Sequence, residues 1–229
     1  WGDGAVEVVS SLGDYTHVYA DGTTNRTITV LVTDEDGQHA NAGTHVVTVN
    51  NVAPSVALTG AEQSAEGASY TLALAGSDPA GSADTLSYSI DWGDGSTVQF
   101  LSAVELAALG GTVAHTFADD EDGPVNASGR TITVTVSDED GGSSTTTKTV
   151  TVNNVAPTAA VSGAATVAEA ASYTLSVGAV VDPGADSVSG YSIDWGDGTT
   201  QAFTSAQWAA AAGSFGHVYA DGAAGGTPV

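Results

Sequence analysis

The sequence predicts an all-β protein in which Ig-like antiparallel β-sandwiches follow one another in tandem, and three observations support this prediction. First, motifs recur along the 229 residues at intervals near the size of one Ig-like sandwich, which is about 100 residues. Second, apolar and hydroxyl residues alternate within short runs, as in strands with one buried face. Third, Gly, Pro and Asp turn signals interrupt these runs roughly every 10 residues.

The repeated motifs come in a fixed order. "WGDG" begins at residues 1, 92 and 195, and each copy is followed by a His-x-aromatic triplet that begins at His17, His115 or His217. "TITV" with a following "DEDG" begins at Thr27 and Thr131, and "TVNNVAP" begins at residues 48 and 151. Because whole groups of motifs recur together, they indicate a repeated structural unit rather than one active site.

The motif order divides the chain into three parts. Residues 1–53 carry the C-terminal part of one repeat, residues 54–156 a complete repeat, and residues 157–229 the N-terminal part of a third. We therefore expect the chain to come from a longer array. The repeats are joined by "NNVAP", which lacks a Gly/Ser tract and ends in a proline that favours extended geometry. We expect short, semi-rigid linkers as a result.

Strands and turns can be placed within the complete repeat. In "TITVTVS" (131–137), Ile132, Val134 and Val136 form an apolar face, and threonines form the other face. The Asp-Gly turn of "DEDGG" and the alternation in "TKTVTVNN" then predict a hairpin, because glycine accepts the positive φ that such turns need. Short helical insertions are expected over residues 102–109 in this copy. The strand that leads into "WGDG" should point four side chains inward: Leu86, Tyr88, Ile90 and Trp92.

The third part of the chain follows the same pattern. "SYTLSVGA" matches "SYTLALAG" of the complete repeat, and a helical insertion is expected over residues 205–212. In each "WGDG" we expect the tryptophan to pack inward and the Gly-Asp-Gly to reverse the chain, with Asp accepting bonds from nearby amides. The structural turn residues are Trp92, Asp94, Trp195 and Asp197.

The acids and histidines of these motifs are the candidates for a catalytic role. Asp91 and Asp94 resemble a carboxylate pair, but a tight turn between glycines offers no cleft and no apolar pocket that raises the pKa of one partner. His115 and His217 are expected to be packed residues, hydrogen-bonded within their sandwiches. His39 and His45 do not recur and lack a third zinc ligand. No catalytic residue is therefore predicted, and we expect the chain not to be an enzyme.

The composition limits the partners. Three Lys and Arg residues stand against 27 Asp and Glu, which gives a formal charge of −24. Such a surface repels nucleic acid and anionic membranes and attracts cations, although a high-salt habitat also produces acidic proteins. Cysteine is absent from the sequence, so disulfides and thiolate metal sites are excluded. No apolar run approaches the roughly 20 residues of a membrane span, so no membrane insertion is expected.

Calcium fits the surplus of carboxylates, because it takes about 6–8 oxygen ligands from carboxylates, amides and carbonyls. Candidate oxygens recur near the start of each sandwich, in "AEGASY", "SDPAGSAD" and "VDPGADS", at the Asn-Asn junctions and at the tip of a hairpin. The alternative is that these acids form only turns and a solvated surface. We expect this for "DDED" (119–122), which has no counterpart in the third copy. The candidate ligands are Glu66, Asp78, Asp84, Asn50, Asn51, Asp138, Asp140, Glu169, Asp182, Asp186, Asn153 and Asn154.

Taken together, "WGDG", the downstream "HVY" or "HTF", "TITVTVSDEDG" and the closing "VTVNNVAP" resemble the PKD (polycystic kidney disease) domain family. The resemblance covers the chain once completely and twice in part. The sequence departs from the family pattern at two points. Trp92 directly precedes Gly93, whereas the family usually has an aromatic residue between the Trp and the "GDG". The last long strand is entered through "SGRTITV", whereas the family often has Gly-x-Tyr there. The resemblance implies a non-enzymatic extracellular module of surface proteins, adhesins or secreted hydrolases, and the shortage of Lys with abundant Ala and Gly favours a bacterial source.

The sequence thus predicts a structural or spacer segment of an extracellular or cell-surface protein, with calcium at the repeat junctions. Its partners would be neighbouring repeats, other copies in a filament, or a surface glycan or protein. The alternative is a carbohydrate- or protein-binding module. That function needs an exposed aromatic strip, and Trp208 in "SAQWAAAA" is the obvious candidate. The ligand-binding residues are otherwise unknown.

Overall fold

The computed structural model describes residues 1–120 and 126–220 and confirms the predicted all-β class. Antiparallel pairing dominates its sheets, and two short helices are the helical elements of the described residues. The contacts divide the chain into two compact units. The first unit comprises Trp1–Glu62, Tyr70–His115 and Gly129–Val150, and the second comprises Gln63–Ser69 with the described residues of 116–128 and 151–220. The predicted repeat boundaries at 53/54 and 156/157 stay predictions.

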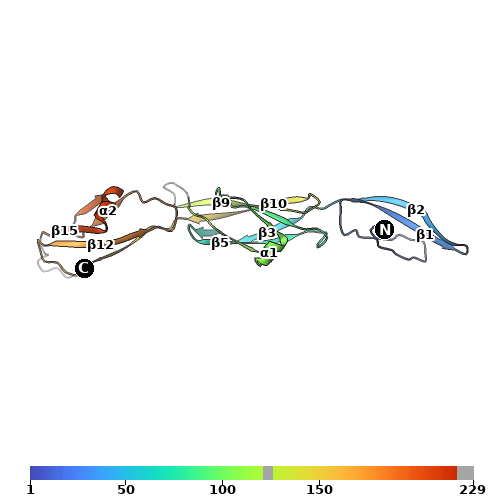
Figure 1. Cartoon of the computed structure of the whole chain (residues 1–229), viewed down its shortest axis with the longest axis horizontal. Coiled ribbons are helices and arrows are strands. Elements are labelled where there is room, and N and C mark those ends of the chain that lie inside the picture. Colours follow the sequence, from blue (N-terminus) through green and yellow to red (C-terminus); the bar gives the residue numbers. More distant parts are fainter. Residues whose placement is uncertain (121–125, 221–229) are drawn as a thin grey trace. The chain divides into compact units, whose positions relative to one another are not determined.

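The first unit contains a long hairpin formed by β1 (Thr24–Asp34) and β2 (Gly37–Val49), drawn in Figure 1. The strands pair antiparallel from Thr24↔Val49 to Asp34↔Gly37, so the turn falls at the predicted Asp-Gly signal. This hairpin is a two-stranded sheet. Val30 and Val32 are therefore about half exposed, at 51% and 48%, in a strand whose apolar alternation predicts a buried face.

The sandwich of the first unit is built from two sheets. One contains β10, β9, β6 and β7 in that order, and the other contains β3, β5 and β8. Helix α1 (Ala103–Ala108) follows β7 and begins with a capping box between Ser102 and Glu105, within the predicted 102–109. The strand bounds are β3 Ser55–Gly60, β5 Ser69–Ser77, β6 Ser87–Asp91, β7 Gln99–Ser102, β8 Thr112–Thr116, β9 Ala127–Ser137 and β10 Ser143–Asn153.

The core of this sandwich confirms the predicted alternation. Ile132, Val134 and Val136 of β9 are fully buried, and the alternate threonines face outward. Each buried aliphatic side chain contributes about 1.5–3 kcal/mol of transfer free energy. Of the predicted inward set before "WGDG", three side chains are buried. Leu86 is only partly buried, because it lies before the first residue of β6.

The second unit contains the described strands of the third copy. β11, β12 and β15 form one antiparallel sheet, and β13 pairs with β14 in another. Near its start, β4 (Gln63–Ala65) pairs in parallel with residues 151–153 of β10. The other bounds are β11 Thr158–Gly163, β12 Ser172–Val181, β13 Tyr191–Asp194, β14 Thr200–Phe203, α2 Ser205–Ala211 and β15 Ser214–Val218.

A small aromatic core holds the third copy together. Its buried members are Val177, Ile193, Trp195 and Phe215. Helix α2 covers this core through Trp208, whose ring stacks on Tyr191 at a centroid distance of 4.3 Å and contacts Phe215 at 4.4 Å. The helix begins with a Thr204–Gln207 capping box and falls within the predicted 205–212. Partial burial of Trp208 against this core therefore explains why the insertion carries an apolar side chain there.

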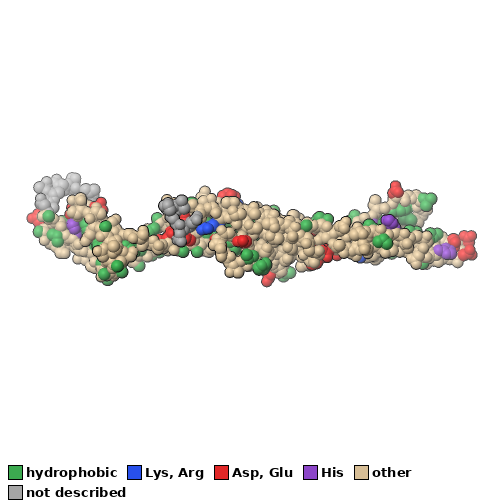
Figure 2. Space-filling model, turned by 90° about the horizontal axis from the view of Figure 1, so that it is seen from above, with side chains coloured by type: hydrophobic (Ala, Val, Ile, Leu, Met, Phe, Trp, Pro, Cys, Tyr) green, Lys and Arg blue, Asp and Glu red, His purple; other side chains and the backbone are tan. Residues whose placement is uncertain are grey.

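The surface carries the acidic character of the sequence. On the face shown in Figure 2, lysine and arginine side chains are scarce beside aspartate and glutamate. Among the described residues, no helix has both the length and the apolar character that a bilayer crossing requires.

Candidate cation sites and the Asp-His-Trp unit

The "WGDG" segments form tight turns, as predicted. Gly93 and Gly95 have φ of +73° and +79°, and Gly196 and Gly198 have φ of +78° and +89°. These values favour glycine, since other residues rarely adopt them. The aspartate between the glycines accepts a hydrogen bond from a backbone amide two residues later, in Asp94 from Ser96 at 3.0 Å and in Asp197 from Thr199 at 2.9 Å.

The same aspartate also binds the histidine of the His-x-aromatic triplet, and that histidine stacks on the tryptophan. We call this arrangement the Asp-His-Trp unit, and it occurs in all three copies. The Asp Oδ2–His Nε2 distances are 2.6, 2.6 and 2.8 Å for Asp3–His17, Asp94–His115 and Asp197–His217. The matching Trp–His centroid distances are 4.9, 4.4 and 4.7 Å, with interplanar angles of 9°, 6° and 10°.

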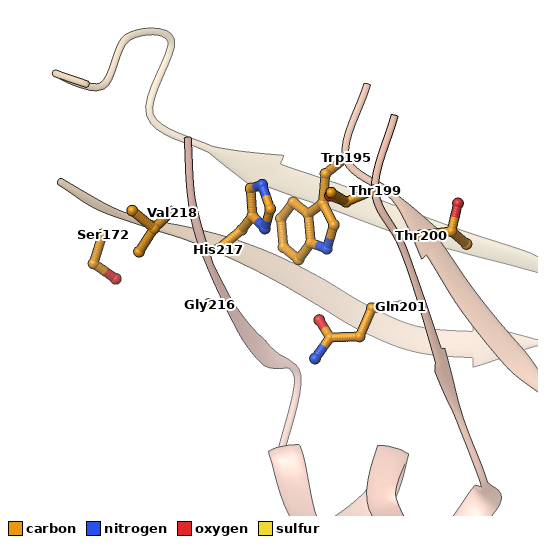
Figure 3. A pocket seen from close by; sticks show the side chains of 8 residues that line it. All are labelled: Ser172, Trp195, Thr199, Thr200, Gln201, Gly216, His217 and Val218. Atoms are coloured by element: carbon orange, nitrogen blue, oxygen red, sulfur yellow. The ribbon is translucent and has the colours of Figure 1, made fainter. Parts of the chain in front are cut away.

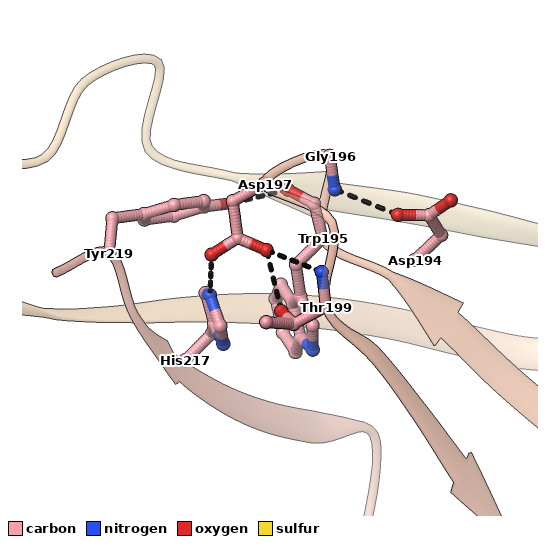
Figure 4. A network of polar contacts seen from close by, with 7 residues as sticks. All are labelled: Asp194, Trp195, Gly196, Asp197, Thr199, His217 and Tyr219. Atoms are coloured by element: carbon pink, nitrogen blue, oxygen red, sulfur yellow. Dashed lines mark hydrogen bonds and ion pairs between the residues drawn. The ribbon is translucent and has the colours of Figure 1, made fainter. Parts of the chain in front are cut away.

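Figure 4 shows how the unit closes in the third copy. Asp197 lies between His217 on one side and the amide and hydroxyl of Thr199 on the other. Tyr219 donates from its hydroxyl to the backbone oxygen of Trp195 at 3.1 Å, as Tyr19 does to Trp1 at 2.8 Å. The sequence predicted packed histidines but missed their aspartate partner, although the joint recurrence of both motifs was the available signal.

An Asp-His pair is also the acid-base element of many active sites, so its surroundings decide its role. His217 Nε2 is engaged by Asp197, and the ring face lies against Trp195. The side chains of Thr199 and His217 lower the pKa of Asp197 to about 2, so this carboxylate stays an acceptor. Figure 3 shows the open depression beside this pair, which Ser172 and Gln201 help to line. The arrangement orients a turn, because it ties Asp197 to both His217 and Thr199.

The first acidic cluster, which we call the Asp84 cluster, lies in the first unit and contains Asp78, Asp84 and Asp138. One carboxylate oxygen of each lies within 4.8 Å of the others. Asp138 accepts from Asn51 Nδ2 at 2.8 Å and from the Gly142 amide at 2.7 Å, and Asp78 accepts from the Ala80 amide at 2.7 Å. Loops that belong to two predicted repeats thus hold these acids together.

Asp84 differs from its two neighbours. It is 6% exposed, and both of its carboxylate oxygens are buried without a hydrogen-bond partner. Burial and the nearby acids Asp78, Asp21, Glu139 and Asp138 raise its pKa to about 6. By contrast, the Asn51 amide lowers the pKa of Asp138. The cluster therefore concentrates negative charge on one carboxylate that the protein does not neutralise.

The second acidic cluster, which we call the Glu66 cluster, lies in the second unit and contains Glu66, Asp119, Asp120 and Asp186. Glu66 is 1% exposed and accepts hydrogen bonds from the Val155 amide at 2.6 Å and the Asp120 amide at 3.2 Å. Burial and the charges of Glu66, Asp119, Asp182 and Asp120 raise the pKa of Asp186. Here the most buried acid has protein partners for both oxygens.

The predicted calcium ligands are distributed unevenly. Five of them are cluster members, and Asn51 binds one of these five, Asp138. The five are Glu66, Asp78, Asp84, Asp138 and Asp186. The charge of Asp182 helps to raise the pKa of Asp186. The side-chain oxygen of Asn154 is buried without a hydrogen-bond partner. Asn153 donates to Gln63 and Ser64. The exposed residues that join neither cluster are Asn50, Asp140 and Glu169.

Sequence reasoning was wrong about the start of "DDED". Asp120 is 2% exposed and Asp119 is partly buried, and both belong to the Glu66 cluster rather than to a solvated loop. The physical reason is the amide of Asp120, which binds Glu66 and draws this segment inward. Residues 121 and 122 lie outside the described residues. The sequence signal for this difference is the second aspartate of "ADD", where the other copies have "ADG".

No protein-family model and no curated protein matches the chain. Among solved structures, the chain is similar to the PKD1 domain of Vibrio anguillarum Epp. The two are 24% identical, with a TM-score of 0.32, and the match covers 45% of this chain and 98% of that domain. Similarity at this level transfers no function.

Proposed function

We propose that this chain is a non-enzymatic structural segment of an extracellular or cell-surface protein. In this role, consecutive PKD-like sandwiches act as a spacer, such as an adhesin stalk or a filament, and calcium stiffens them. The observation that carries the proposal is the recurrence of the Asp-His-Trp unit in every copy, with its aspartate and histidine bound to each other. A repeated module whose aspartate and histidine already bind each other suits length and spacing better than chemistry.

The acidic surface supports an extracellular setting for this role. Extracellular calcium modules bind the ion with a Kd of about 10⁻⁴–10⁻³ M, so weak sites made of carboxylates are sufficient there. A net charge of −24 also keeps a long array soluble and favours cations over nucleic acid.

Solution scattering tests the spacer role. The largest dimension of the full chain should be greater, and its distance distribution narrower, in calcium than in chelator, because a spacer needs a stiff joint between modules. A distribution typical of freely jointed modules under both conditions would contradict a stiffened spacer.

The alternative is a binding module for a glycan or a protein. Trp208, its candidate from the sequence, packs into the core of the third copy. Phe100, which is 75% exposed, is the better probe among the described residues. We expect immobilised polysaccharides and matrix proteins to retain neither the wild type nor Phe100→Ala. Retention of the wild type that Phe100→Ala abolishes would replace the structural function with a binding function.

A further inference from the structure

We propose that Asp78, Asp84 and Asp138 form a binding site for one calcium ion within the first compact unit. The site follows from the position of these three carboxylates, which each place an oxygen within 4.8 Å of the other two. Two oxygens bound to one calcium at 2.3–2.6 Å lie at most about 5 Å apart, so the spacing is compatible with a shared ion.

Asp84 provides the evidence that distinguishes a site from a chance group of acids. Asp84 is only 6% exposed, which means that it is more than nine-tenths buried. Neither of its carboxylate oxygens has a hydrogen-bond partner. A buried carboxylate without a partner costs several kcal/mol unless it is neutralised or paired. The charges that act on Asp84 come from further acids, so a bound cation supplies the compensation that its surroundings lack.

The other two carboxylates are held in place to complete the site. Asp138 is fixed through one oxygen by the Gly142 amide and through the other by Asn51. Asp78 is fixed through Oδ1 by the Ala80 amide, while its Oδ2 is buried without a hydrogen-bond partner. Gly142 permits this close packing, because a Cβ there would lie 2.4 Å from Asp138 Oδ2 and 2.8 Å from Asn51 Nδ2. Each anchored acid therefore keeps coordination capacity for an ion.

The donor set selects calcium among common metal ions. The cluster consists of carboxylates, with no cysteine in the chain and no histidine in the group. Hard oxygen donors suit calcium and magnesium rather than zinc or copper. Calcium tolerates irregular geometry and completes its shell with water, whereas magnesium demands near-ideal octahedral positions that loop carboxylates rarely offer.

The site gives the proposed stiffening a location, and in that consequence it depends on the proposed function. Asn51 belongs to the "TVNNVAP" linker, and Asp138 belongs to the turn between β9 and β10. An ion bound to Asp138 would therefore fix the residue that holds the linker. Binding itself can be tested without any assumption about stiffness.

The test is calorimetric titration of calcium into the chelator-treated full chain, its Asp84→Asn variant and an Asp140→Asn control from the same hairpin. Wild type and Asp140→Asn should bind the same number of ions, and Asp84→Asn should bind one fewer or bind it at least tenfold more weakly. Identical titrations for all three chains, or no binding by the wild type, would overturn the proposal.

Thermal melting separates a metal ligand from a structural acid. Calcium should raise the melting temperature of the wild type and of Asp140→Asn but raise that of Asp84→Asn less. In chelator, Asp84→Asn should melt no lower than the wild type, since it removes a crowded charge. A lower melting temperature in chelator, with an unchanged calcium response, would make Asp84 structural and end the proposal.

If Asp84→Asn does not fold, Asp78→Asn takes its place with the same expectations. If calcium binds but leaves the largest dimension and the distance distribution from scattering unchanged, only the proposed spacer function is contradicted.

Discussion

Carboxylates are hydrogen-bonded in opposite ways in the turns of the Asp-His-Trp units and in the Asp84 cluster. In the turns, Asp94 and Asp197 each receive a backbone amide on one oxygen and a histidine on the other. In the cluster, Asp84 is more deeply buried, yet neither oxygen has a hydrogen-bond partner. The pKa shifts follow this difference, downward for Asp197 to about 2 and upward for Asp84 to about 6. Acids that belong to repeated motifs are thus not equivalent in their surroundings.

The Glu66 cluster lies between these extremes. Like the Asp84 cluster, it gathers several acids, but its most buried member accepts two backbone hydrogen bonds. Glu66 therefore resembles the aspartates of the turns in its bonding and Asp84 in its surroundings. The comparison teaches that hydrogen bonding to the protein, more than proximity of acids, separates a carboxylate with protein partners from one whose buried charge lacks compensation.

Glu66→Ala should produce the largest effect. It leaves the buried amides of Val155 and Asp120 without their acceptor, and each loss of this kind costs about 1–3 kcal/mol. We expect the free energy of unfolding to fall by about 3 kcal/mol in urea, to a similar extent with and without calcium. Glu169→Ala, at the exposed position that corresponds to Glu66 in the next copy, is the control and should change stability little. A loss that calcium restores would move Glu66 to the ligand class.

Asp94→Asn should have a smaller effect. Asparagine can still accept from the Ser96 amide but loses the charge that faces His115, and charge-assisted hydrogen bonds contribute about 1.5–3 kcal/mol. We expect a loss of about 2 kcal/mol, measured by urea unfolding and followed by the fluorescence of the tryptophans. Asp91→Asn, next to the same turn, keeps its single bond to the Gly93 amide and should be nearly neutral. Equal losses in both variants would mean that the histidine pairing adds nothing.

The sequence predicted the repeated elements well because their causes are local. Alternation in "TITVTVS" fixed the buried face of β9, and the glycines of "WGDG" fixed a turn that needs positive φ. The capping residues Ser102 and Thr204 likewise place the helices close to their predicted bounds. These features depend on neighbours in the chain, so one copy of the repeat contains the information.

The candidate site was predictable only in part because its geometry is not local. In the sequence, about half of the complete repeat separates Asp84 from Asp138. Their approach in space therefore depends on the packing of loops. Sequence pattern could select acids near the loops, yet it could not distinguish the buried Asp138 from the exposed Asp140 two residues later. It also placed Asp120 in solvent, because the buried partner that draws it inward, Glu66, lies far away in the sequence.

Lowering the pH should affect the turns before it affects uncharged parts of the core. The folded-state pKa of Asp197 is about 2, below the unfolded value of 3.8, so its stabilisation is fully present above pH 4. It is lost as the pH falls from about 4 to about 2, because protonation removes the acceptor for His217 and Thr199. Near-ultraviolet circular dichroism of the tryptophans should follow this loss. Asp197→Asn lacks this titration, so an unchanged acid transition in that variant would contradict the assignment.

The smallest effect is expected for Asp140→Asn, which tests whether geometry or sequence pattern identifies a ligand. Asp140 was a candidate from the sequence because it shares the "DEDG" tip with Asp138, but it is exposed and lies outside the Asp84 cluster. Surface substitutions of this kind rarely change stability by more than about 0.5 kcal/mol. We therefore expect a melting temperature within about 2 °C of the wild type and the same calcium-induced rise. Loss of that rise would show that the hairpin tip folds onto the ion, which would add Asp140 to the ligands and weaken the rule that a site requires a carboxylate buried without a partner.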